Sequence, residues 1–165
     1  MATHDIEIRG PDHLPESGVF FDRIGNQIAA ANPIGNQLAE VLSDAGADRG
    51  WYDNFKVPQN YVGTPVIVLR GILDGAMTTV TAAIGVRGIV LADNAAADVA
   101  YSTEDLGNTA VDHADEDEVE ILITLVNLVP VAGRMCYYHF FINADVNTYT
   151  GNILVTGLFF RFNDA

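Results

Sequence analysis

From Trp51 to the last residue of the chain, short stretches of β-forming residues alternate with turn signals. Each stretch is rich in valine, isoleucine, threonine or aromatic residues, which are the types enriched in strands. Turns are marked by residues such as Pro58, Pro130 and Gly133. We expect strands over 51–57, 64–70, 77–91, 119–128, 134–143 and 152–162. This pattern predicts a mainly β protein with an antiparallel β-sandwich or jelly roll over 51–165.

The first 50 residues differ in pattern and are expected to form an N-terminal arm. A short strand is expected over 6–9, and the motif Ile-Gly-Asn-Gln occurs twice, at 24–27 and 34–37. Helical spacing of apolar residues predicts a helix over 34–44 and a weaker helical turn over 24–31. The repeat is either a chance similarity or a duplicated docking segment.

The last two expected strands carry apolar residues on both of their faces. A strand of a sandwich usually shows one polar face to water, and a large exposed apolar face marks an interaction site. We therefore expect a second copy of the chain to cover the outer face, with the N-terminal arm as the alternative cover. The residues expected at this homo-oligomer interface are Tyr137, His139, Phe141, Leu158 and Phe160.

The chain is strongly acidic, with 8 basic and 22 acidic residues and a net charge of −14. This charge argues against binding to nucleic acid or to an anionic membrane, because both need a basic surface. The acidic residues are mostly aspartate, and Lys56 is the only lysine. Such a composition is typical of proteins from extreme halophiles, since molar salt shortens the Debye length to about 3 Å and screens self-repulsion. An ordinary acidic protein is the alternative.

No motif of catalysis is present, so we expect neither an enzyme nor a cofactor. The four histidines are scattered, and Cys136 is the only cysteine. Residues 92–118 are expected to be mostly loop, and six carboxylates crowd into 112–120. Dense oxygen ligands can hold Ca²⁺ or Mg²⁺, although a solvated acidic loop is the simpler interpretation. The weak candidates for metal ligands are Asp115, Glu116, Asp117 and Glu118.

Four segments of the β half carry a distinctive pattern of strands and turns. The first is Trp51 followed by Phe55-x-Val57-Pro58-x-x-Tyr61, and the second is the apolar run over 66–69. The third runs from Arg134-x-x-Tyr137-x-His139-Phe140 to the turn Asp145-Val146-Asn147-Thr148. The fourth is the closing run over 153–162. Together these segments resemble virion structural proteins of tailed phages and haloarchaeal tailed viruses, and the resemblance implies a jelly-roll-like protein of the capsid decoration, turret or fibre type.

The resemblance also implies how such a protein acts. It would be made in the host cytoplasm and built into the virion as a trimer, pentamer or hexamer. Its partners would be other virion proteins, such as capsid or adaptor proteins, on which the arm, 1–50, would dock. The apolar residues expected to make this contact are Val19, Phe20, Phe21, Ile24, Ile34 and Leu38. A tail or baseplate component is one alternative. A carbohydrate- or receptor-binding sandwich is another, with Trp51, Tyr52, Tyr61 or Tyr101 as a platform for host-surface glycans.

Overall fold

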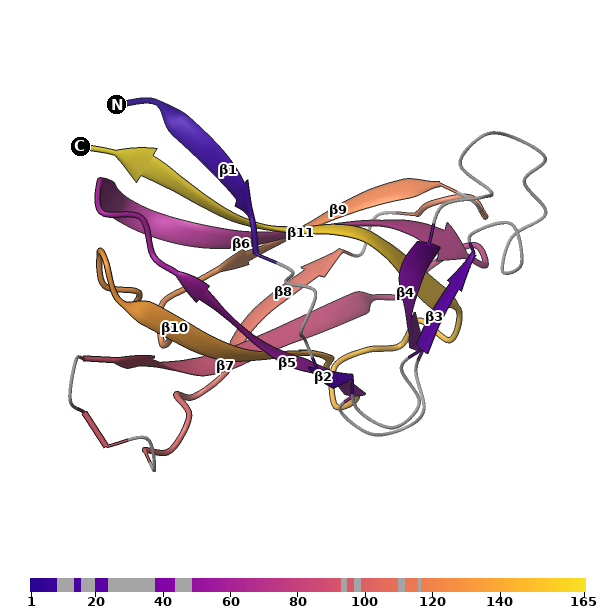
Figure 1. Ribbon diagram of the computed structural model, residues 1–165. Coiled ribbons are helices and arrows are strands. Elements are labelled where there is room, and N and C mark those ends of the chain that lie inside the picture. Colours follow the sequence, from indigo (N-terminus) through magenta and orange to yellow (C-terminus); the bar gives the residue numbers. More distant parts are fainter. Residues whose placement is uncertain are drawn as a thin grey trace.

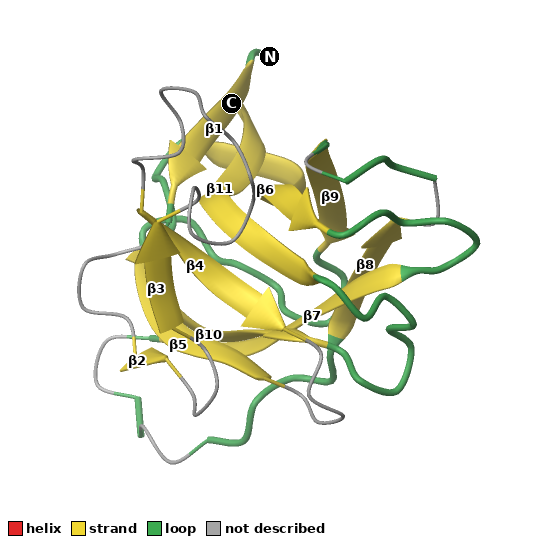
Figure 2. Cartoon of the chain, turned by 90° about the vertical axis from the view of Figure 1, so that its right-hand side faces the viewer, coloured by secondary structure: helices red, strands yellow, loops and turns green. Residues whose placement is uncertain are grey.

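The computed structural model consists of two antiparallel β-sheets that face each other (Figures 1 and 2). Within the residues that the structure describes there are eleven strands and no helix. The expected mainly β, sandwich-like architecture is therefore confirmed. The described residues are 1–8, 14–15, 20–23, 38–43, 49–92, 95–96, 99–109, 112–115 and 117–165.

One sheet, called sheet A, has the strand order β3-β4-β11-β6-β9. β1 belongs to the same sheet and pairs with the later part of β11, which β4 leaves unpaired. Its strands are β1 (Thr3–Glu7), β3 (Phe20–Arg23), β4 (Leu38–Ser43), β6 (Tyr61–Asp74), β9 (Glu118–Thr124) and β11 (Asn152–Asp164). The other sheet, called sheet B, has the order β2-β5-β10-β7-β8. Its strands are β2 (Leu14–Pro15), β5 (Arg49–Lys56), β7 (Ala82–Leu91), β8 (Asp105–Thr109) and β10 (Met135–Ile142).

The core lies between the sheets and is rich in aromatic rings. Trp51 on β5 packs against Phe140 on β10 with ring centroids 4.7 Å apart, and Phe55 packs against Phe160 of sheet A at 4.9 Å. Full burial of a large apolar side chain stabilises a fold by roughly 1.5–3 kcal/mol. The largest fully buried side chains between the sheets therefore hold them together: Trp51, Tyr138, Tyr149, Phe140 and Phe160.

Strands β5, β6, β7, β9, β10 and β11 all lie within or close to the ranges expected from the sequence. The helix expected over 34–44 is wrong for the described part of that range, because 38–43 form β4. Backbone pairing with β11, Leu42 opposite Ile153 for example, outweighs the helical spacing of the apolar residues. The helical turn expected over 24–31 lies outside the described residues.

A β-bulge in β11 reverses which of its residues face the core. Val155 pairs with Gly71 and Gly157 pairs with Arg70, so Thr156 is an extra residue on this strand. A shift of one residue moves every following side chain to the other face. Leu158 and Phe160 consequently lie in the core and are fully buried. Their expected place at an oligomer interface is wrong, because strict alternation was assumed along a strand that contains a bulge.

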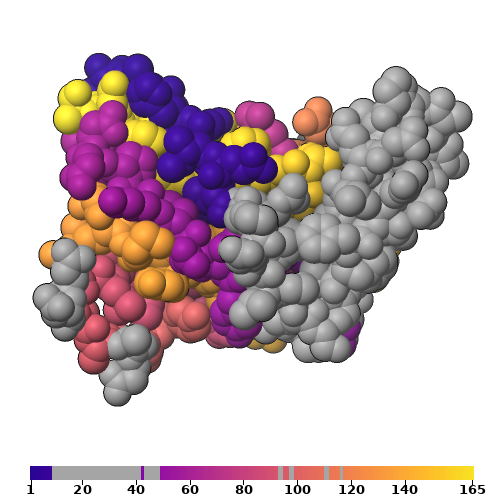
Figure 3. Space-filling view, in the orientation of Figure 1, coloured from indigo at the N-terminus to yellow at the C-terminus, as the bar shows by residue number. Residues whose placement is uncertain are grey.

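The two ends of the chain lie side by side. β1 pairs antiparallel with the last part of β11, with Thr3 opposite Asn163. The backbone amide of Ala2 donates to Oδ1 of Asp164 at 2.6 Å. Figure 3 shows the first strand lying on the surface against the last one. Among the described residues no helix is long and apolar enough to cross a membrane.

Candidate functional site

The outer face of sheet B carries a regular set of cross-strand rows. Directly opposed residues of antiparallel strands point to the same side of the sheet. Tyr137 and His139 of β10 therefore share one face with their partners on β5 and β7. The four rows are Lys56–Met135–Leu91, Asn54–Tyr137–Ile89, Tyr52–His139–Arg87 and Gly50–Phe141–Gly85.

Two of these rows form an aromatic stack that needs no partner to bury it. The His139 ring lies between Tyr52 and Phe141, with centroids 4.2 Å and 4.6 Å away. Nε–H of Arg87 donates to Nδ1 of His139 at 3.2 Å, and the guanidinium lies over the Phe141 ring. A side chain at Gly85 would collide with that ring, so the glycine makes room for it. The sequence pattern placed these rings on a strand but gave no sign of the stack.

Of the five residues expected at an oligomer interface, Tyr137 is the one with substantial exposure. It is 37% exposed, whereas His139 is 1% and Phe141 is 0% exposed within a single chain. The outer position expected for Tyr137, His139 and Phe141 is thus observed. His139 and Phe141 do not need a second chain for their burial.

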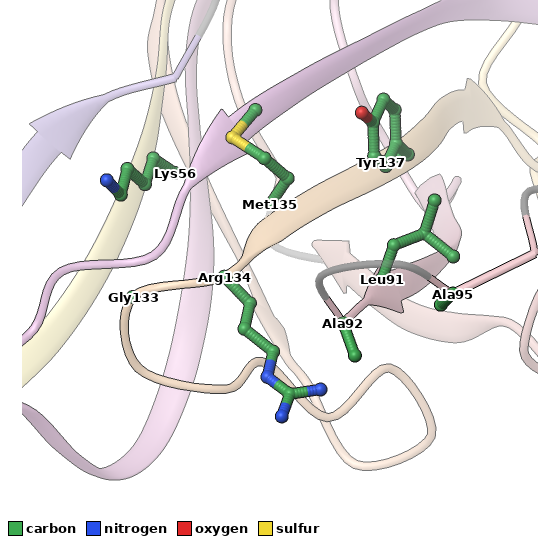
Figure 4. A pocket seen from close by; sticks show the side chains of 8 residues that line it. All are labelled: Lys56, Leu91, Ala92, Ala95, Gly133, Arg134, Met135 and Tyr137. Atoms are coloured by element: carbon green, nitrogen blue, oxygen red, sulfur yellow. The ribbon is translucent and has the colours of Figure 1, made fainter.

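A pocket of about 320 Å³ opens at the end of this face, next to Tyr137 (Figure 4). Lys56 ends β5, Leu91 ends β7, and Arg134 and Met135 lie at the start of β10. The pocket is lined by Lys56, Leu91, Ala92, Ala95, Gly133, Arg134, Met135 and Tyr137. The antiparallel register explains the gathering, because it places Lys56, Met135 and Leu91 in one row. Pro130 and Gly133 marked the turn in the sequence, but the pocket depends on three strands meeting.

The outer face of sheet A carries ion pairs instead. Arg161 on β11 bonds to Asp5 on β1 through both Nε and Nη2, at 2.7 and 2.8 Å. Glu120 on β9 accepts from Arg70 at 3.1 Å and from Arg161 at 3.5 Å. Arg161 holds the pKa of Asp5 below its ordinary value through this hydrogen bond. The Arg70 guanidinium also lies over the Phe159 ring.

The acidic run offers hydrogen bonds to backbone amides. Asp115 accepts from the amide of Gly75 at 2.7 Å, and Asp117 accepts from Ala114 at 2.8 Å. Glu118 begins β9. Among the described residues no group of three or more histidine, cysteine or acidic side chains could hold a metal ion. Glu116 lies outside the described residues.

An uncharged loop follows β9. Residues 121–133 contain no charged side chain, although the chain has 30 charged residues. Val126 and Val129 are 68% and 63% exposed, and Val131 is exposed as well. We call Val126, Val129 and Val131 the valine loop. Its position is fixed by the carboxylate of Asp105, which accepts from the amides of residues 126–128 at 2.9–3.1 Å.

The remaining expected residues have varied places. Trp51 is in the core, so it offers no platform for a sugar. The rings of Tyr52 and Tyr101 are stacked 6.3 Å apart, and Tyr101 is exposed. Tyr61 donates from its hydroxyl to the carbonyl of Gly63 at 2.8 Å. Cys136 is buried, which raises the pKa of its thiol to about 12.

The structure describes half of the expected docking residues. Phe20 and Phe21 lie in β3 and Leu38 begins β4. Val19, Ile24 and Ile34 lie outside the described residues. β3 pairs with β4, which in turn pairs with β11, so this part of the arm belongs to sheet A.

A scan of the chain against protein-family models and a search of curated proteins found no match.

Proposed function

We propose that β4 to β11 form a jelly roll and that the protein is a non-enzymatic structural component of a tailed-virus virion. The strand order carries this proposal. In a jelly roll, eight strands in two Greek keys make two sheets. Here β4, β11, β6 and β9 are neighbours in one sheet, and β5, β10, β7 and β8 are neighbours in the other. Jelly rolls occur in viral capsid proteins and in lectins. The resemblance of the closing strands to virion proteins favours the first of these.

The proposed mechanism is assembly into a homo-oligomer through the valine loop. The valine loop exposes apolar side chains and brings no charge into a contact, which favours association in molar salt, where repulsion between the acidic copies is screened. Asp105 holds the loop in one conformation before any partner arrives. A preformed loop loses little entropy on binding.

Light scattering after size exclusion tests the assembly. In 2 M salt at about 50 μM chain, we expect the wild type to be an oligomer whose mass falls on dilution. The double variant Val126→Asp/Val129→Asp should be a monomer, because it places charge on the contact. Val99→Asp is the matched control, since Val99 is an exposed valine outside the loop. A wild type that stays monomeric, or a control that dissociates equally, would overturn the proposal.

The proposed position is on the capsid surface, as decoration, turret or fibre of a haloarchaeal virus. The acidic surface supports an exposure to brine. A tail or baseplate component is the alternative position. Mass spectrometry of purified virions tests the virion role at either position, because a structural protein must be present in the particle. If virions lack the protein while infected cells contain it, the virion role is wrong.

A further inference from the structure

We propose that the pocket between Lys56, Arg134 and Tyr137 binds an acidic oligosaccharide, whose pyranose rings bear carboxylates. This inference goes beyond the assembly role and does not depend on it. The two cations point to different sides of the pocket in Figure 4, so each is assigned to a separate carboxylate, and the tyrosine is assigned to a sugar ring. The three residues come from β5 and from the start of β10 (Figure 4).

The first argument is the charge of the pocket. The chain has only eight basic residues against 22 acidic ones, yet two of the eight line this one pocket. Most other described arginines are engaged: Arg70 and Arg161 form ion pairs, and Arg87 bonds to His139. Within the described part of the chain, neither Lys56 nor Arg134 forms an ion pair. The charged side chains among the described lining residues are therefore both cations, on a chain whose net charge is −14.

The second argument is the combination of apolar and aromatic surface with that charge. Leu91, Ala92 and Met135 supply apolar contacts, and the Tyr137 ring is exposed beside them. The face of an aromatic ring is electronegative and attracts weakly positive C–H groups. One face of a pyranose ring presents such C–H groups, while its hydroxyl groups point outward. A uronic acid thus has a feature for each part of the pocket.

The third argument is size and surroundings. A volume of about 320 Å³ lies at the lower end of small-molecule pockets, which suits one or two sugar rings. Tyr52, in the row after Tyr137, stacks on the exposed Tyr101, so further aromatic surface continues along the same sheet face. An oligosaccharide could extend over it. An acidic peptide would use the two cations but has no flat ring for Tyr137, so a sugar fits better.

Isothermal titration with trigalacturonate tests the inference, in the lowest salt at which circular dichroism shows a folded chain. We expect saturable binding, and binding about ten-fold weaker for the methyl-esterified trisaccharide, which lacks only the charge. Lys56→Gln and Arg134→Gln should each weaken binding by about ten-fold, and Tyr137→Ala by about five-fold. These are surface substitutions, so the variants should remain folded.

Arg49→Gln is the matched control, because Arg49 is a β5 arginine outside the pocket and its removal should change affinity by less than about two-fold. A hexaglutamate peptide probes the rival ligand. The inference is overturned if trigalacturonate does not bind, or if its methyl ester binds equally well. It is also overturned if the control loses as much affinity as the pocket variants, or if the peptide binds as tightly as the sugar.

Discussion

The two sheets close their outer faces by different chemistry. Sheet A uses ion pairs, in which Arg70 and Arg161 share Glu120 and Asp5. Sheet B uses the rings of Tyr52, His139 and Phe141, one of them bonded to Arg87. Salt screens exposed charges but leaves apolar burial intact or strengthens it. We therefore expect the stabilisation from the outer face of sheet A to depend on salt, and that from the outer face of sheet B to be nearly independent of it.

Removing one ring from each outer face gives the largest contrast. Phe141→Ala should lower the free energy of unfolding by about 3–5 kcal/mol, because the fully buried ring fills the space over Gly85. Phe159→Ala on sheet A should cost only about 1–2 kcal/mol, since that ring is half-buried under Arg70. Urea unfolding followed by fluorescence measures both. Equal losses would contradict the comparison.

The rate of chemical labelling of the Cys136 thiol measures the same difference in stability between the two variants without denaturant. Burial raises its pKa to about 12, so the thiolate is scarce and a thiol reagent should react only through opening of the fold. Each 1.36 kcal/mol of lost stability raises the labelling rate about ten-fold. We expect acceleration of about a hundred-fold or more in Phe141→Ala and about ten-fold in Phe159→Ala. Rapid labelling of the folded wild type would show that the thiol is accessible after all.

The next largest expected difference between the two outer faces is how the cost of a substitution on each face changes with salt. Arg161→Gln should destabilise the fold by about 1 kcal/mol in 0.2 M salt and by much less in 2 M salt, because its partners are partly exposed. Arg87→Gln on sheet B is the matched change, and its cost should vary little with salt. Unfolding of each variant is compared with wild type at the same salt, which cancels the general effect of salt on the fold. If the cost of Arg161→Gln were the same at both salt concentrations, the proposed difference between the two outer faces would be wrong.

The smallest expected effect concerns pH. The pKa of Asp5 in the folded chain lies below its ordinary value of 3.8, through its hydrogen bond to Arg161. Its contribution to stability is therefore present above pH 3.8 and is lost as the pH falls through the lowered folded pKa. Asp5→Asn should cost about 0.5–1 kcal/mol at pH 6, and this cost should shrink steadily as the pH falls below 3.8. A cost that does not change with pH would assign the effect to packing instead.

The strands from Trp51 onward were predictable because their apolar residues follow the period of a strand. β8 was not, since Asp105, Gly107 and Asn108 are poor strand formers. It pairs with β7 all the same, and Gly107 lets it approach β9, where a side chain would collide with the backbone of Leu122. In β4, long-range pairing overrides local spacing, which a single sequence does not reveal.

The candidate site was predictable only in part. The exposed Tyr137 was expected on an outer face, but its neighbours Lys56 and Arg134 are 78 residues apart in the chain and meet only through pairing. Gly157 stands at the bulge and is a signal for one, but alternation was continued across it, which placed Leu158 and Phe160 on the wrong side. Asp105 lay in a run expected to be loop, with no signal that its carboxylate would hold the valine loop.

The neighbouring first and last strands have a practical consequence for engineering. Because Ala2 and Asp164 are already hydrogen-bonded, a linker of a few residues would join the two ends without disturbing sheet A. The chain could then be reopened at another surface turn as a circular permutant. Cargo fused to such a new end would be displayed at a chosen surface site, while the linker keeps the original first and last strands joined.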